Sequence, residues 1–380
     1  MRRAPLRLAA ALLTLAASTG CKAGPFGPRT PAEGDAAQTS GSVPKPSVND
    51  PEGGLDGSVL PRTARGAVEE KFFRVDTLIS QWDAAQHDGQ TAEADGLAGR
   101  IAAAVDGDFA TFDSASKGAL GVKGQAIAVQ ALGFSRRAEA TDLLVSTLKE
   151  RDAALVGNAL IGLKLRADPN TPLPPLIDLL RANFTEARRY APLALANVVL
   201  AREKVGRPVE SRTAEEAMTG LVGLIRDRDP YVRLHAAKAM GALRRSEAID
   251  FLVLLLRDEH PTIRIAAAAA LQRVGDPRAF PPIVALLDEM PVDQKPIVRE
   301  ILVSFAERLQ GGPLTEAEVK GLDVSPRAWD RWFASRDGKG RAPAPSSSGV
   351  PAGPPSPPPP TSLPPAPRSF GEPSLLPPTR

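Results

Sequence analysis

The sequence contains few of the residues on which most protein chemistry depends. Among its 380 residues there is one cysteine, Cys21, and there are three histidines. A single cysteine excludes an intrachain disulfide and a cysteine-based metal site within this sequence. The histidines, His87, His235 and His260, form no His-x-x-x-His or Glu-x-x-His pair, so we expect no metal site.

Motifs of catalysis and of nucleotide binding are also missing. The sequence has no Gly-x-Ser-x-Gly turn of the kind that presents a nucleophilic serine. The glycine-rich stretch 118–124 lacks the Gly-Lys-Ser/Thr ending of a phosphate-binding loop. Segment 106–113 lacks the glycine and glutamate positions of a calcium loop, and its aspartates are expected to cap helices instead. We therefore expect no catalytic residues, no enzymatic activity and no cofactor.

Neither charge nor aromatic content favours binding to nucleic acid. The formal net charge is only +3, and aromatic residues make up 4% of the chain. Basic and acidic residues are interspersed, without a basic stripe interleaved with aromatic residues. Paired arginines such as Arg136-Arg137 and Arg244-Arg245 are expected to complement helix dipoles near helix ends. A weak patch for anionic surfaces is the alternative.

Residues 1–20 have the layout of a cleaved secretory signal. Three early arginines precede about ten mostly apolar residues, and small residues follow. The apolar run is shorter than the roughly 20 residues that a membrane-spanning helix needs. A signal peptide that directs the protein out of the bacterial cytoplasm is therefore expected.

The only cysteine directly follows this segment. Ser18-Thr19-Gly20-Cys21 resembles the lipobox of bacterial lipoproteins, although the usual apolar residue three before the cysteine is a serine here. The resemblance implies a lipid anchor on Cys21, and Lys22 after it implies the outer membrane, facing the periplasm. An ordinary secretory signal with an incidental cysteine is the alternative.

Two stretches are predicted to be disordered. Residues 21–66 are rich in Gly, Pro, Ser and Thr without periodic apolar residues, which is typical of a flexible linker. Residues 336–380 form a Pro-rich tail, which favours extended polyproline II conformations. The tail is either a spacer that contacts the cell wall or an inert extension.

The region between them, residues 67–335, has the apolar spacing of helices and an internal repeat. Val68, Val75 and Ile79 share one face of a first amphipathic helix. Further along, Pro230 aligns with Pro261 at an offset of 31 residues, and the residues around them also match. Each unit has a helix, a turn containing proline and an Ala-rich second helix. Because such a hairpin hides its apolar face only against its neighbours, stacking is expected.

The two central units resemble HEAT repeats, in particular the short bacterial form related to phycobilisome-lyase-type repeats. The family pattern D-x-x-P-x-V-R-x-x-A-A-x-A-L is matched at 227–240 and 258–271. The resemblance implies an all-α solenoid of five to six hairpins. It also implies an Asp–Arg ladder that braces neighbouring turns, while arginines that read a ligand are the alternative. The ladder residues are Asp227, Arg233, Asp258 and Arg264.

We expect the second helices to bind a protein partner in the cell envelope. The aromatic segment 326–333 either seals the end of the array or forms a binding hot spot. The candidate binding residues are Arg188, Arg189, His235, Lys238, Trp329 and Trp332.

The functional hypothesis is a non-enzymatic, envelope-anchored scaffold for protein–protein interaction. A structural spacer that binds the cell wall is the first alternative. A lyase or chaperone for a chromophore, suggested by the lyase-type repeats, is the second. We expect no nucleic-acid partner.

Overall fold

The computed structural model describes residues 62–336. The chain divides into two units, Met1–Arg341 and Ala342–Arg380, and the described residues all lie in the first. Their regular structure is entirely helical, with sixteen α-helices, three short 3-10 helices and no strand in this range. The predicted all-α fold is therefore confirmed. The predicted signal peptide, the predicted lipid anchor on Cys21, residues 21–61 of the predicted linker and nearly all of the Pro-rich tail fall outside the described residues. Residues 62–66, also predicted as linker, belong to the first helix instead.

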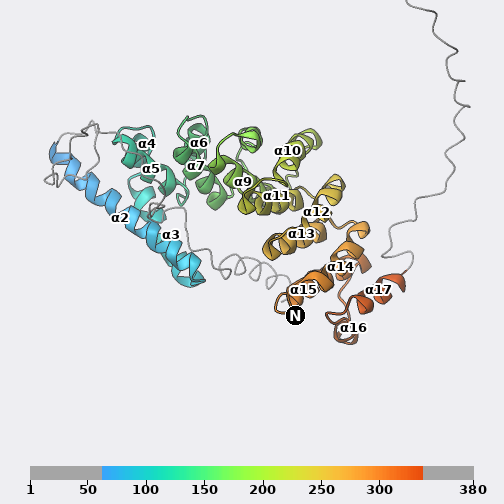
Figure 1. Cartoon of the computed structure of the whole chain (residues 1–380). Coiled ribbons are helices and arrows are strands. Elements are labelled where there is room, and N and C mark those ends of the chain that lie inside the picture. The colour runs from blue at the N-terminus through green and yellow to red at the C-terminus, as the bar shows by residue number, and fades with distance from the viewer. Residues whose placement is uncertain (1–61, 337–380) are drawn as a thin grey trace, which may run out of the picture. The chain divides into compact units, whose positions relative to one another are not determined.

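Figure 1 labels most of the α-helices, which are numbered in chain order. Their bounds are α2 (Arg62–His87), α3 (Thr91–Gly107), α4 (Phe109–Ser116), α5 (Gly121–Leu132), α6 (Glu139–Thr147), α7 (Ala153–Arg166), α8 (Pro174–Asp178), η1 (Leu179–Arg181), α9 (Thr185–Lys204), α10 (Ser211–Leu224), α11 (Pro230–Leu243), η2 (Ser246–Ala248), α12 (Ile249–Leu255), α13 (Pro261–Val274), η3 (Pro277–Ala279), α14 (Phe280–Glu289), α15 (Lys295–Gln310), α16 (Glu316–Gly321) and α17 (Pro326–Ala334). None of these described helices is long and apolar enough to cross a membrane.

The helices from α4 to α15 form six consecutive hairpins. The second helices, α5, α7, α9, α11, α13 and α15, contact one another in chain order and form a continuous row. Before them, α2 and α3 pair, and α2 also contacts α5. After them, α17 packs against α14. The number of hairpins agrees with the five to six that the sequence predicts.

The turn within each central hairpin is set by its proline and the residue before it. In α11 the carboxylate of Asp229 accepts a hydrogen bond from the Tyr231 amide at 2.9 Å, and Pro230 occupies the first helical turn. Proline suits this position because its fixed φ matches a helix and its missing N–H needs no partner there. Pro261 also occupies the first turn of α13, although His260 before it makes no side-chain hydrogen bond to the helix, and Gly275, with φ of 79°, ends the helix.

Small residues bring the second helices close together. A Cβ atom on Gly241 of α11 would lie 2.7 Å from the Cα of Ala270 on α13. A Cβ atom on Gly133, directly after α5, would lie 2.6 Å from the Cα of Gly162 on α7. The backbones thus approach each other directly at these positions, while larger side chains such as Leu252 are buried in the core.

Candidate functional site

The central feature between hairpins is a ladder of buried ion pairs. Arg233 of α11 donates from Nε and Nη2 to the two carboxylate oxygens of Asp258, at 2.7 and 3.0 Å. The preceding rung joins Arg188 Nε of α9 to Asp227 at 2.7 Å. Each rung therefore runs from a second helix to the turn of the following hairpin. The side chain of Arg233 reaches Asp227 only at its backbone oxygen, at 2.9 Å.

The ladder stops at Arg264. Its guanidinium donates to the backbone oxygen of Asp258 at 3.2 Å, but its Nε has no hydrogen-bond partner in the described part of the chain. Thus Asp227, Arg233 and Asp258 take part in rungs between hairpins, whereas Arg264 makes a contact within its own hairpin.

Two of the predicted binding residues are occupied by internal contacts. Arg188 forms the first rung, so its guanidinium already pairs with Asp227, and its role in binding a partner stays a prediction. Arg189 forms an ion pair with Asp229 and lies over the ring of Tyr231, 5.4 Å from its centroid. Arg189 is partly exposed, but its charge is neutralised within the structure.

His235 is also an internal residue rather than an exposed contact. Its side chain is buried, and Nδ1 lies 2.6 Å from the backbone oxygen of Arg189. A carbonyl oxygen only accepts hydrogen bonds, so the ring carries its proton on Nδ1. Burial, reinforced by the nearby charge of Lys238, lowers the pKa of His235 to about 3. The neutral ring therefore ties α11 to α9.

Lys238 retains the potential to bind a partner, and the structure adds Lys164 of α7 to it. Both ammonium groups are shielded from water, and this burial lowers the pKa of each. The charge of Lys164 lowers the pKa of Lys238 further. Lys164 was not among the predicted site residues, although the sequence shows it as a basic residue within a mostly apolar second helix.

The two predicted tryptophans seal the end of the array. Trp329 and Trp332 of α17 are 0% and 7% exposed and pack with Phe280 of α14. The indole nitrogen of Trp329 donates to the backbone oxygen of Asp323 at 2.8 Å. This burial favours the interpretation that the two rings seal the end of the array over a binding hot spot.

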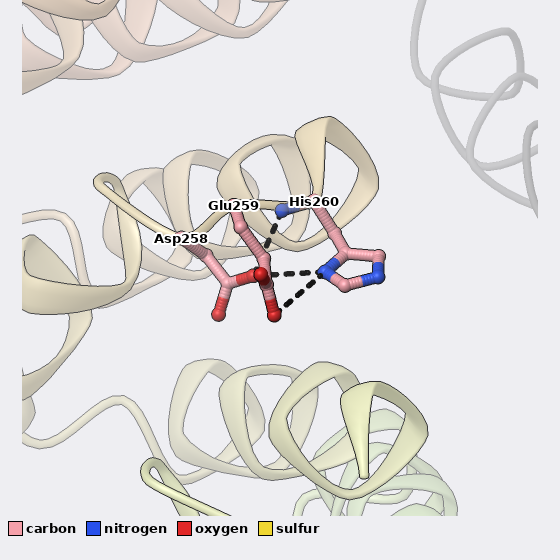
Figure 2. A group of neighbouring side chains, drawn as sticks. All are labelled: Asp258, Glu259 and His260. Atoms are coloured by element: carbon pink, nitrogen blue, oxygen red, sulfur yellow. Dashed lines mark hydrogen bonds and ion pairs between the residues drawn. The ribbon is translucent and has the colours of Figure 1, made fainter. Parts of the chain in front are cut away.

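Asp258, Glu259 and His260 form the one group of potential metal ligands among the described residues (Figure 2). Their ligand atoms lie within 4.8 Å of one another. However, Nη2 of Arg233 lies 3.0 Å from Asp258, 3.1 Å from Glu259 and 3.3 Å from Nδ1 of His260. The guanidinium already supplies the positive charge that a metal ion would bring. These residues therefore fit a structural ion-pair cluster better than a metal site.

Together these features define the class: an α-helical repeat protein whose hairpins stack through their second helices. Residues 219–303 match the family model of HEAT repeats. No curated protein matches the chain.

Solved structures with some similarity include engineered repeat proteins. One engineered protein is 20% identical and has a TM-score of 0.40, over 54% of this chain and 98% of its own. A second engineered protein is 20% identical with a TM-score of 0.44, over 72% of this chain and 75% of its own. A designed armadillo repeat protein in complex with the peptide (KR)4 is 16% identical and has a TM-score of 0.33, over 68% of this chain and 99% of its own.

Proposed function

We propose that this protein is a non-enzymatic scaffold that binds other proteins through the row of second helices. The observation that carries the proposal is the continuous packing of these helices from α5 to α15. Such a row displays side chains from consecutive hairpins on one surface, which is how repeat proteins engage extended partners. Burial and internal pairing of His235, Arg188 and Arg189 support a structural role for these groups over catalysis.

The proposal places the scaffold in the bacterial cell envelope, anchored by a lipid on Cys21. Its support is the sequence alone: a signal-like segment that ends at the only cysteine. Lys22 after the cysteine favours the outer membrane. Labelling of growing cells with an alkyne fatty acid tests this anchor. The wild-type chain should take up the label and sediment with membranes, and Cys21→Ser should do neither. A labelled Cys21→Ser chain would contradict the anchor.

Site-specific crosslinking in intact cells tests the binding role. A photoreactive residue replaces Ala269, which is half-buried on the second helix α13, or Leu254, which is 51% exposed on the first helix α12. The proposal predicts discrete adducts from position 269 and none from position 254. Equal adducts from both positions, or none from either, would contradict binding through the second helices.

A spacer that contacts the cell wall is the second candidate, and the composition of residues 336–380 is the observation that favours it. Co-sedimentation with peptidoglycan distinguishes the two. Retention that disappears when residues 336–380 are removed supports the spacer. Retention that is absent in both forms contradicts it. A lyase-type activity on a chromophore has no support beyond the resemblance of the repeats.

A further inference from the structure

Two positive charges without an ion-pair partner lie on the two second helices that flank α9. Lys164 belongs to α7 and Lys238 to α11, and α9 packs against both helices. Each side chain is only partly exposed. Among the described residues, no carboxylate oxygen lies within 4.0 Å of the Nζ atom of Lys164 or Lys238, the distance limit for an ion pair. This differs from Arg188, Arg189 and Arg233, whose charges are all paired.

The groups around the two amines leave this positive charge largely uncompensated. His235 is neutral and hydrogen-bonded to α9. Arg189 is matched by Asp229. The carboxylate of Asp83 on α2 interacts with Lys164 through space, but it is exposed and farther away than an ion pair.

Burial of each charged amine costs stability, as its lowered pKa indicates, and the charge of Lys164 adds to this cost at Lys238. A protein that needed only packing at these positions would be more stable with neutral side chains. The arrangement becomes favourable when an anionic group supplies the missing negative charge and hydrogen-bond acceptors. Two separate ammonium groups, each with three donors, suit carboxylates spaced along an extended chain.

We propose that Lys164 and Lys238 form a docking site for an acidic, extended segment of a partner protein, with carboxylates that pair with the two amines. This inference rests on the proposed function and names the chemistry that the second helices recognise. A protein segment fits better than nucleic acid, because the net charge is only +3 and basic and acidic residues are interspersed.

The test measures binding of fluorescent hexaglutamate and hexalysine peptides to the full chain by anisotropy at low salt. The wild type should bind hexaglutamate and not hexalysine. The double variant Lys164→Gln, Lys238→Gln should bind hexaglutamate about tenfold more weakly or worse, which corresponds to roughly 1.4 kcal/mol. Lys123→Gln, which removes an exposed lysine from α5, should bind like the wild type. Asp83→Asn should bind a few-fold more tightly, because it removes a repulsive charge.

Several outcomes would overturn the proposal. One is unchanged affinity in the double variant, and another is equal loss in Lys123→Gln. Binding of inorganic phosphate, or of vesicles with anionic lipid, without binding of hexaglutamate would assign the site to another anion. If hexaglutamate binds only after Asp50, Glu52 and Asp56 are replaced by neutral residues, the chain's own acidic segment occupies the site, and a partner protein does not.

Thermal unfolding separates recognition from structure. The double variant should melt at the same or a higher temperature than the wild type, because it loses a desolvated repulsion. A lower melting temperature would show that the amines stabilise the fold and would also overturn the proposal. If crosslinks form at position 269 while the lysine variants have no effect on peptide binding, this inference fails and the scaffold function remains.

Discussion

Arg233 of α11 and Asp258 of the next hairpin form a two-point ion pair, with hydrogen bonds of 2.7 and 3.0 Å. Their side chains are only 10% and 6% exposed. Asp258 also accepts a hydrogen bond from the His260 amide at 2.9 Å. Because Arg233 and these acceptors belong to different hairpins, the pair couples the two units. Its strength comes from charge-assisted hydrogen bonds in a shielded place.

Replacing Asp258 with Asn should destabilise the protein strongly. The change removes the buried negative charge and leaves the guanidinium of Arg233 with only the exposed Glu259 as a counter-ion, so we expect a loss of about 2–4 kcal/mol in the free energy of unfolding. Urea unfolding measures it. The control is Glu216→Gln, which breaks an exposed pair with Arg212 and should cost less than about 0.5 kcal/mol. Equal losses for the two variants would show that the Arg233–Asp258 pair is no stronger than a surface contact.

The sequence predicts the fold well because its signals are local. Proline at the start of α11 and α13, glycine after α13 and apolar spacing within each helix all act over a few residues. The offset of 31 residues between Pro230 and Pro261 then shows that the same unit recurs. The end of α9 was harder to predict. This helix continues to Lys204, because the polar residues in its last turn are compatible with a helix and mark no sharp end.

The candidate site is predicted less well because its contacts join distant residues. Arg188 and Asp227 are 39 residues apart in sequence, and nothing local shows which arginine pairs with which aspartate. Burial of Trp329 depends on the packing of α17 against α14. The effect of the Lys164 charge on the pKa of Lys238 depends on the packing of α7 and α11 against α9. Charge and aromatic character are visible in a sequence, but accessibility follows from tertiary contacts.

His235 should make the protein sensitive to mild acid. Its pKa is about 3 in the folded chain and 6.5 in its ordinary state, so the unfolded chain binds more protons between these pH values. The free energy of unfolding should therefore be unaffected by this group well above pH 6.5 and fall by about 2 kcal/mol between pH 7 and 5. The carboxylates of Asp227 and Asp258 have pKa values below 3.8 and contribute only in stronger acid.

The variant His235→Asn tests this pH dependence. Its amide nitrogen can still donate to the backbone oxygen of Arg189, but it does not titrate. Urea unfolding at pH 7 and 5 should show a clearly smaller loss in the variant than in the wild type. The same loss in both proteins would assign the acid sensitivity to other groups.

Trp329→Ala should destabilise the end of the array selectively. Removal of a fully buried tryptophan costs about 3–5 kcal/mol. Because each hairpin contacts mainly its neighbours, faster amide hydrogen exchange is expected in α14, α15 and α17 and not in α2 to α5. Unchanged exchange throughout would mean that the indole does not stabilise this end.

Ala167 should be replaceable by glycine with a gain in stability. It ends α7 with a φ of 44°, a left-handed conformation that strains any residue with a Cβ atom. We expect Ala167→Gly to add about 0.5–1 kcal/mol. The same change at Ala103, which is exposed inside α3, should cost about 1 kcal/mol. Thermal unfolding of both variants checks the opposite signs, and destabilisation by both would rule out strain at Ala167.

The close contact of second helices is tested most directly by paired glycine substitutions in two helices. Gly99 lies inside α3 with no atom within 4 Å of an added Cβ, so Gly99→Ala should raise the free energy of unfolding by about 0.5–1 kcal/mol. Gly241 lies inside α11, where an added Cβ would meet the backbone of Ala270 on α13 at 2.7 Å. Gly241→Ala should therefore lower that free energy by about 1–3 kcal/mol. If both substitutions stabilise the protein, α11 and α13 do not touch there, and the stacked array is wrong.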